Sequence, residues 1–402
     1  MKIVLINAVY GIMSTGRTYM ELQDFLQKKG HECVVVYGNQ RGNYPETLYM
    51  GNTLDHKCHA LLGRITGKGG CYSSLPTRRL IRFLKDYQPD VVHLGNLHGN
   101  FINIPMLLKF LGENDIVTTV TLHDCYFFTG GCMHYTSNGC YKWKSECGKC
   151  PHYKSQNSWV FDRTKELQGY KIKYFNSIRR LGVIGVSEWI LNEATQSPVF
   201  SNAAVSVKIH DWIDLKIFHP CGDTAKEQLK ITGKKMILGV ASGWGPKKGL
   251  YDFIELSQML NSDYKIVLVG KMPEDTSLPD NILSVPATEN VQELVGYYSA
   301  ADVFVQLSKE ETFGKVVAEA LACGTPAVVY DTTASPELVE DGCGIAVNVS
   351  AGIDGIYNAI MEVMSDPKEK YSTFSRGKAM DSFEQERCCN EFLNLWCKLL
   401  AE

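Results

Sequence analysis

The chain has 402 residues, of which 45% are apolar, and it carries 41 Lys and Arg against 44 Asp and Glu. This length predicts two or three domains with sizeable cores. No apolar run reaches the roughly 18 residues that a membrane-spanning helix needs, and the apolar run after Lys2 breaks at Gly11, too early for a secretory signal. Fourteen cysteines without such a signal indicate a reducing compartment, so we expect a cytoplasmic protein.

Charge is unevenly distributed along the chain. Residues 1–215 carry 24 Lys and Arg against 17 Asp and Glu, and residues 216–402 carry 17 against 27, so the two parts have formal charges of +7 and −10. A basic first part predicts contact with anions, either the inner face of a membrane or a lipid-diphosphate acceptor, unless the surface charge has no function. The acidic second part and the lack of a basic and aromatic stripe argue against nucleic acid.

The first half of the chain alternates between strand and helix patterns. A strand is predicted from Lys2 to Val9, and a helix from Arg17 to Lys29 follows a glycine-bearing loop. Further strands are predicted at residues 32–37, 89–94, 116–122 and 180–186. Strands that alternate with helices predict a parallel α/β sheet, whose ligands gather at the carboxyl ends of the strands.

The pattern restarts after Asp214. Strands are predicted at residues 236–241, 264–269, 282–285, 303–307 and 326–330, and an amphipathic helix at the end of the chain. We therefore expect two α/β domains, 1–214 and 215–385, followed by a helix at 386–402.

The stretch Val303–Pro326 reads VFVQLSKEETFGKVVAEALACGTP. It predicts a short strand, a polar loop that ends at Gly314, and a helix. The N-terminus of a helix offers free backbone N–H groups to an anion. Glu311 in the loop and Glu319 in the helix add carboxylates that accept hydroxyl protons. Backbone amides that bind phosphate, next to carboxylates that bind hydroxyl groups, suit a sugar nucleotide.

Seven residues separate Glu311 from Glu319, and this stretch resembles the E-x7-E signature of the family-4 retaining glycosyltransferases. The alternative is an ordinary buried strand–helix unit with solvated or capping glutamates. The segment at 121–151, TLHDCYFFTGGCMHYTSNGCYKWKSECGKCP, resembles a bacterial subgroup that assembles capsular polysaccharides and exopolysaccharides, including colanic-acid-type enzymes. Matching blocks run from Asn7 through Gly344.

The resemblance implies a GT-B fold, in which two Rossmann-like domains face each other across a cleft and the last helix crosses back to the first domain. The first domain would bind the acceptor and the second the nucleotide sugar. The implied reaction is retaining hexosyl transfer, without a cofactor, to a hydroxyl of a glycan or polyprenyl-diphosphate-linked acceptor. A nucleotide-sugar epimerase, a glycoside phosphorylase and a non-catalytic glycan- or nucleic-acid-binding module remain alternatives.

The resemblance also implies functional residues. The expected catalytic residues are Glu311, His123 and Lys248. The residues expected to bind the donor are Gly16, Lys247, Gly270, Lys271, Val291, Phe313, Gly314, Lys315 and Glu319. Family members usually place an arginine where this chain has Ser242 and Gly243, so one diphosphate contact is missing.

Two of these predictions also have support from the residues alone. Lys247 and Lys248 at a helix start suit a diphosphate, because their charge adds to the positive helix end, although two solvated surface lysines would look the same. His123 follows a buried strand, where a histidine either contacts a ligand or caps the strand. Asp124 beside it is a candidate general base.

Four cysteines lie in one short polar segment, with the spacing C-x7-C-x6-C-x2-C. Only the last pair has a spacing typical of zinc, but four thiolates fit a closed structural site. Unligated thiols and a redox pair are the alternatives. The predicted zinc ligands are Cys132, Cys140, Cys147 and Cys150.

Overall fold

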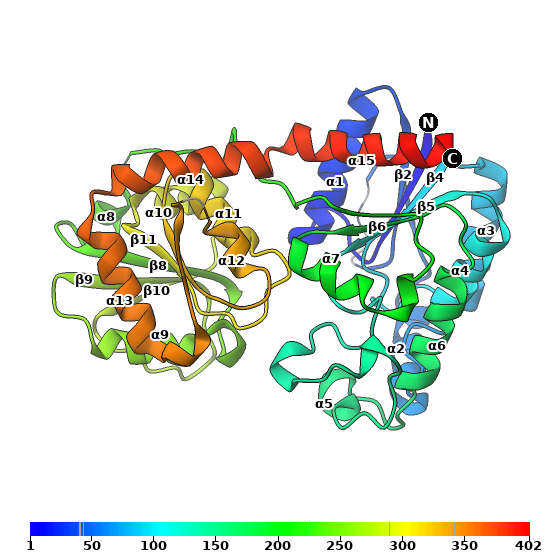
Figure 1. Cartoon of the computed structure of the whole chain (residues 1–402), viewed down its shortest axis with the longest axis horizontal. Helices are drawn as coiled ribbons and strands as arrows, with labels where there is room; N and C mark the ends of the chain where they lie inside the picture. The colour runs from blue at the N-terminus through cyan, green and yellow to red at the C-terminus, as the bar shows by residue number, and fades with distance from the viewer. Residues whose placement is uncertain (40–41, 43, 223, 289, 341) are drawn as a thin grey trace. The chain divides into compact units, whose positions relative to one another are not determined.

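The computed structural model describes residues 1–39, 42, 44–222, 224–288, 290–340 and 342–402. Internal contacts divide the chain into two compact units, drawn in Figure 1. The first unit comprises Met1–Ile209 and Cys389–Glu402, and the second comprises His210–Cys388. Among the described residues, no helix combines the length and the apolar character that crossing a bilayer requires.

The first unit is built on a parallel sheet that, in the described residues, has seven strands in the order β3-β2-β1-β4-β5-β6-β7. Its central strands are buried along nearly their whole length, as expected for strands covered on both faces. The strands are β1 (Lys2–Asn7), β2 (Glu32–Tyr37), β3 (Thr47–Tyr49), β4 (Val91–Leu94), β5 (Val117–Leu122), β6 (Leu181–Gly185) and β7 (Val205–Lys208).

The helices of the first unit include the end of the last helix of the chain. That helix is α15 (Gln385–Ala401), and the indole N–H of its fully buried Trp396 donates a hydrogen bond of 2.9 Å to Thr119 Oγ1 on β5. The other helices of this unit are α1 (Met13–Lys28), α2 (Thr53–Thr66), α3 (Ser74–Tyr87), α4 (Ile104–Glu113), α5 (Tyr153–Asn157), α6 (Thr164–Phe175) and α7 (Glu188–Thr195).

The second unit has a parallel sheet of six strands, counted over its described residues, in the order β10-β9-β8-β11-β12-β13. The chain moves outward from β8 on one side and from β11 on the other, so these two central neighbours form the switch point of the sheet. Ligands of such sheets bind at the carboxyl ends of the strands beside that point. The strands are β8 (Lys235–Gly243), β9 (Tyr264–Lys271), β10 (Ile282–Val285), β11 (Val303–Gln306), β12 (Ala327–Tyr330) and β13 (Gly344–Val347).

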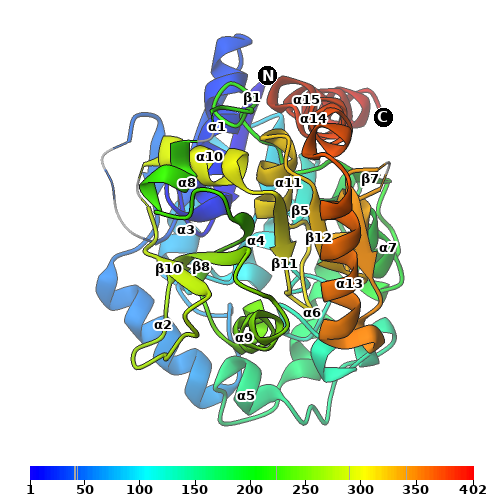
Figure 2. The same ribbon diagram turned by 90° about the vertical axis from the view of Figure 1, so that its left-hand side faces the viewer.

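Helices cover both faces of the second sheet (Figure 2). Phe253 of α9 and Ile356 and Ile360 of α13 form one core with Ile237, Val305 and Val328 of the strands. Helices α10 and α11 lie on the opposite face. The helices are α8 (Thr224–Gln228), α9 (Leu250–Gln258), α10 (Val291–Ala300), α11 (Lys315–Ala322), α12 (Ser335–Leu338), α13 (Gly352–Ser365) and α14 (Lys368–Phe383).

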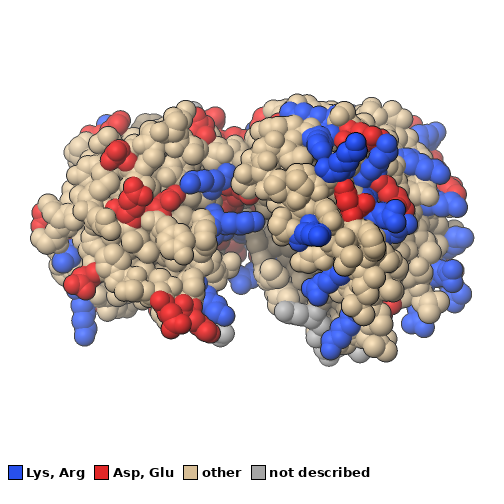
Figure 3. Space-filling model, turned by 90° about the horizontal axis from the view of Figure 1, so that it is seen from below, with Lys and Arg blue, Asp and Glu red and all other residues tan. Residues whose placement is uncertain are grey.

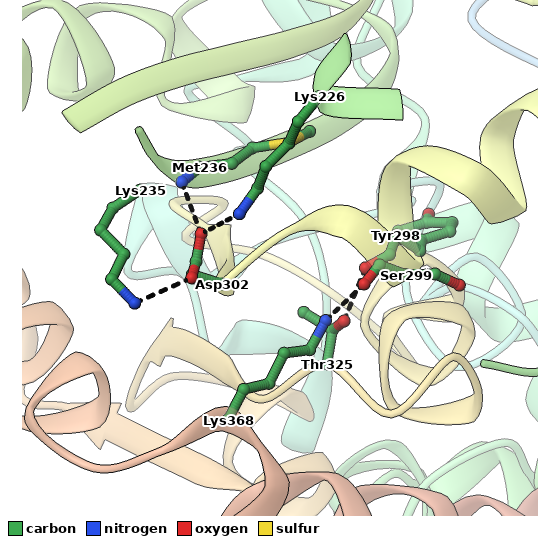
Figure 4. Close-up of polar contacts among 8 residues, drawn as sticks. All are labelled: Lys226, Lys235, Met236, Tyr298, Ser299, Asp302, Thr325 and Lys368. Carbon is green, nitrogen blue, oxygen red and sulfur yellow. Dashed lines mark hydrogen bonds and ion pairs between the residues drawn. The ribbon is translucent and has the colours of Figure 1, made fainter. Parts of the chain in front are cut away.

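A partly buried carboxylate fixes the start of β11 against β8. Asp302 accepts hydrogen bonds from Lys226 Nζ at 2.8 Å, from Lys235 Nζ at 3.1 Å and from the backbone N–H of Met236 at 2.8 Å (Figure 4). Because β8 and β11 are parallel, this anchor at their amino ends also sets how their carboxyl ends lie side by side.

The compact units end a few residues away from the boundaries at 214 and 385 that the sequence predicts. The N–H of Ile213 donates a 2.8 Å hydrogen bond to the carbonyl of Phe383, and Ile213 also forms a parallel bridge with Glu384. These contacts attach residues 210–214 to the second unit, and the helix α15 continues from the second unit into the first.

Candidate active site

Two predicted catalytic residues meet at the switch point of the second sheet. Lys248 lies in the loop after β8 and Glu311 in the loop after β11, and Lys248 Nζ is 2.5 Å from Glu311 Oε1. The Lys248 side chain is 40% exposed and that of Glu311 is 16% exposed. The ammonium group therefore has donors left for a ligand while one holds the carboxylate.

A glycine lets the two loops approach. Gly249 follows Lys248 and has φ +75°, and a Cβ at this position would lie 2.4 Å from the Cβ of Leu307, just after β11. Only glycine has this backbone conformation without strain and also leaves this space. Lys247, on the other side of Lys248, is exposed.

The backbone of Glu311 is held by the segment after β12. Its N–H donates a 3.0 Å hydrogen bond to Thr333 Oγ1, and its carbonyl accepts one of 3.2 Å from the N–H of Ala334. Thr333 has φ +51°, an uncommon conformation for a β-branched residue. Sequence analysis missed Thr333, because no local pattern marks it.

Glu319 lies on α11 and is partly buried. The hydroxyl of Tyr298 on α10, which is fully buried, donates a 2.8 Å hydrogen bond to Glu319 Oε2. Burial, and then the charge of Glu319, raise the pKa of Tyr298 well above its ordinary value, so this hydroxyl stays a donor. Sequence analysis missed Tyr298 too, and its spacing from Glu319 gives no local signal.

The N-terminus of α11 is formed by three predicted donor-binding residues. Gly314 has φ +93°, and a Cβ there would lie 2.8 Å from Leu338 Cδ1. Phe313 is buried, with its ring 5.6 Å from that of His210 and 5.4 Å from that of Phe383, so its backbone rather than its ring can contact a ligand. Lys315 is the first residue of the helix and is partly exposed.

Three further predicted residues lie outside this group. Gly270 and Lys271 are the last two residues of β9, and Gly270 has φ +136° with no room for a Cβ, which would lie 1.9 Å from the carbonyl oxygen of Ala241. Lys271 is exposed, and Val291 is the first residue of α10. Their predicted contacts with the nucleotide stay predictions.

The first unit contains the two other predicted residues. Helix α1 begins at Met13 rather than at Arg17, so the N–H of Gly16 falls within the helical ladder, and the free amides are those of residues 12–15. The prediction that the Gly16 loop supplies amide donors is corrected accordingly. Gly16 is needed for packing, because a Cβ would lie 3.2 Å from Tyr10 N. His123 follows β5 and is partly buried, with its ring 6.2 Å from that of Tyr19.

The four predicted zinc ligands line one small cavity of about 20 Å³, roughly the size of one water. Burial raises the pKa of Cys132 to about 12 and that of Cys147 to about 11, although a backbone hydrogen bond from Gly130 lowers the latter. Over the described residues, no group of three or more His, Cys, Asp or Glu side chains is arranged so that it could hold a metal ion. Zinc therefore stays a prediction.

Comparison with known families covers most of the chain. The model described as "Glycosyl transferases group 1" matches residues 223–379, which include the Lys248–Glu311 pair and Glu319. The model described as "Glycosyltransferase Family 4" matches residues 15–200. The chain is a GT-B glycosyltransferase of the family-4 type.

Curated relatives of this glycosyltransferase have different functions in their names. The N-acetyl-alpha-D-glucosaminyl L-malate synthase of Bacillus anthracis is 23% identical over 55% of this chain and 60% of its own length. WcaC, an Escherichia coli K12 glycosyl transferase assigned to colanic acid biosynthesis, is 22% identical over 82% of this chain and 83% of its own length.

Solved structures confirm the predicted fold of the glycosyltransferase. Sucrose-phosphate synthase from Thermosynechococcus elongatus aligns over 100% of this chain and 99% of its own, with a TM-score of 0.71 and 17% identity. Anabaena HepE in complex with UDP and glucose aligns over 99% of this chain and 100% of its own, with a TM-score of 0.67 and 15% identity. At these identities the likeness establishes the fold alone.

Proposed function

We propose that this glycosyltransferase moves a hexose from a nucleoside diphosphate sugar to a hydroxyl of a lipid-linked glycan acceptor, with retention at the anomeric carbon, during assembly of a cell-surface polysaccharide. The observation that carries the proposal is the Lys248–Glu311 pair at the switch point, next to the start of α11. WcaC, which is assigned to colanic acid biosynthesis, and HepE, solved with UDP and glucose, support the choice of pathway and donor.

In this proposal, Lys248 acts on the leaving group. The bond between the anomeric carbon and the diphosphate oxygen breaks, and the nucleoside diphosphate leaves with the electron pair. The acceptor oxygen forms the new bond, and its proton passes to the departing diphosphate. Lys248 and the free amides at the start of α11 stabilise the charge that develops on the diphosphate. The ion pair with Glu311 keeps Lys248 in place before the donor binds.

The two glutamates have different roles. Glu311 orients the hexose, because its carboxylate accepts hydroxyl protons beside the breaking bond. Glu319 binds the ribose hydroxyls, and the hydrogen bond from the Tyr298 hydroxyl holds its carboxylate in place. Gly270, Lys271 and Val291 border the base.

A thermal-shift screen tests this function. A ligand that binds only the folded chain raises its Tm, so we expect UDP or another nucleoside diphosphate to raise the Tm of the wild-type protein. The Glu319→Ala variant should lose this shift, whereas Glu362→Ala, an exposed glutamate on α13, should keep it.

Three outcomes would contradict the proposal. If no nucleotide and no nucleotide sugar raises the Tm, the second unit is not a donor site. If a nucleotide sugar is isomerised without any acceptor, the chain is an epimerase, and if turnover requires inorganic phosphate, it is a phosphorylase.

A further inference from the structure

The first unit contains a polar cavity of about 250 Å³ that none of the assignments above uses. It is lined by residues of α2, of the loop after β4, of the start of the loop after β5, and of the segment 131–159. At about 30 Å³ for each water, the volume corresponds to roughly eight waters. That is room for one sugar ring, and the volume lies just below the range of about 300–1,000 Å³ that is typical of sites for drug-sized ligands.

One wall of the cavity is a rigid aromatic ring. Trp159 is 7% exposed and lies against Gly69 and Gly131, where a Cβ would come within 3.0 Å and 2.5 Å of its indole atoms. The N–H of the next residue, Val160, donates a 2.8 Å hydrogen bond to the carbonyl of Arg64 and so fixes this segment to α2. The exposed part of this fixed indole gives the cavity an aromatic surface beside its polar groups, a combination that small-molecule sites usually have.

A paired histidine lines another side. His98 Nε2 is 2.7 Å from Asp124 Oδ2, and Asp124 Oδ1 accepts a 2.8 Å hydrogen bond from the N–H of Tyr126. Burial lowers the pKa of His98, but the charge and hydrogen bond of Asp124 raise it by more, so the net direction is upward. Beneath Tyr126, the ammonium of the buried Lys171 lies 3.8 Å from the ring centroid and donates to the carbonyl of Thr129 at 3.0 Å.

The remaining polar groups suit hydroxyls and an anion. Asn100, Gln156 and Asn157 are partly buried and line the cavity, and a side-chain amide can both donate and accept hydrogen bonds. Arg64 lines the cavity and is exposed. Its guanidinium is a bidentate partner for phosphate. Lys and Arg side chains are spread over the first unit, the right-hand part of Figure 3.

We propose that this cavity binds the sugar of the acceptor that carries its phosphate ester, with that phosphate at Arg64. Trp159 packs on the ring, while His98 and the amides of Asn100 and Asn157 hold its hydroxyls. The inference rests on the proposed transferase function, because it gives the acceptor a place and a chemical class: a sugar carried on a phosphate or diphosphate ester.

The test uses the full chain labelled with 5-fluorotryptophan and followed by fluorine NMR. The chain has six tryptophans, and the Trp159 resonance is assigned as the one that disappears in Trp159→Phe. The probes are the 1-phosphates of glucose, galactose, mannose, N-acetylglucosamine and N-acetylgalactosamine, the matching methyl α-glycosides, inorganic phosphate and UDP. At least one sugar 1-phosphate should shift the Trp159 resonance saturably, with a Kd about tenfold below that of its methyl glycoside, as one charge-assisted contact predicts.

Matched variants assign the phosphate contact. Arg64→Gln should remove the tenfold preference for the 1-phosphate and leave binding of the methyl glycoside unchanged. Asn157→Asp places a negative charge on the wall without changing its size and should weaken sugar-phosphate binding. Arg79→Gln, at an exposed arginine on α3 away from the cavity, should change neither.

Three results would overturn the inference. The Trp159 resonance could stay in place with every sugar of the panel, or inorganic phosphate could shift it as much as the sugar 1-phosphates do. The third is that UDP shifts it in the wild type and no longer does so in Arg64→Gln. The same samples separate this inference from the proposed function. If no nucleotide and no nucleotide sugar raises the Tm while sugar phosphates still shift Trp159, the cavity stands and the donor site is refuted. If UDP binds and Trp159 does not respond, only the cavity assignment is refuted.

Discussion

Lys248 Nζ and Glu311 Oε1 are joined by an ion pair between two loops whose residues are 63 positions apart in the chain. If Lys248 stabilises the leaving diphosphate, its removal should act on kcat. We expect Lys248→Ala to lower kcat by about 10²–10³, the usual effect of losing one charge-stabilising group. Steady-state transfer assays with a saturating donor measure this.

The control for that experiment is Lys234→Ala. Lys234 is exposed and lies just before β8, at the end of the strand opposite to the Lys248 loop. Its kcat should equal that of the wild type. Near-normal turnover in a folded Lys248→Ala protein would show that the ion pair is structural only.

The hydroxyl of Tyr298 should contribute to nucleotide binding without touching the nucleotide. Tyr298→Phe removes the donor that fixes Glu319, and hydrogen bonds to charged groups contribute about 1.5–3 kcal/mol, so the Kd for the nucleoside diphosphate should rise about tenfold or more. Titration calorimetry measures this Kd. Tyr297→Phe is the matched control, because Tyr297 on the same helix donates instead to Glu293. Equal affinities in the two variants would contradict the role given to Tyr298.

The anchor at Asp302 should make stability depend on pH. Burial by itself raises the pKa of Asp302, but the hydrogen bond from Lys226, with those from Met236 and Lys235, lowers it below the ordinary value of 3.8. A depressed folded pKa stabilises the fold above pH 3.8, and that stabilisation is lost as the pH falls through the folded value.

We therefore expect Asp302→Asn to lower the free energy of unfolding by about 1–3 kcal/mol at pH 7, because the partly buried Lys226 then loses its charged partner. The difference from the wild type should shrink below pH 3.8. Calorimetric Tm values across this pH range measure it, with the exposed Asp381→Asn as a control of unchanged stability. A difference that persists in full under acid would contradict the assigned pKa shift.

The cysteine cavity leads to a metal prediction. If the four thiols bind zinc as thiolates, the purified chain should contain about one zinc per molecule, and Cys147→Ser should lose it. Cys397→Ser, at an exposed cysteine on α15, should retain it. Elemental analysis after gel filtration measures the zinc content. A zinc content below about half an equivalent per chain would favour the free thiols that the structure contains.

The parts of the site that follow local patterns were predictable. Glu311, Gly314 and Glu319 lie in one strand–loop–helix unit, and the helix that begins at Lys315 confirms the prediction for that stretch. The parallel order of both sheets also follows from alternating strands and helices.

The rest depends on contacts between distant segments. Nothing near Glu319 in the sequence marks Tyr298, and nothing near Glu311 marks Thr333. The wall at Trp159 requires Gly69 and Gly131, which lie 90 and 28 residues earlier in the chain, so the cavity of the first unit has no periodic signature. The start of α1 was misplaced because Gly16 was taken as a loop glycine, whereas it allows close packing on Tyr10.

The hydrogen bond from Trp396 to Thr119 has a consequence for biosynthesis. The hydrophobic interior of the first unit includes residues that leave the ribosome only after the entire second unit has been translated. A nascent chain halted before Cys389 should therefore expose the surface of β5 that Trp396 covers, and limited proteolysis of arrested chains should cleave it faster than the released protein. The first unit, although most of it is translated before the second, is therefore the last to reach its final stability.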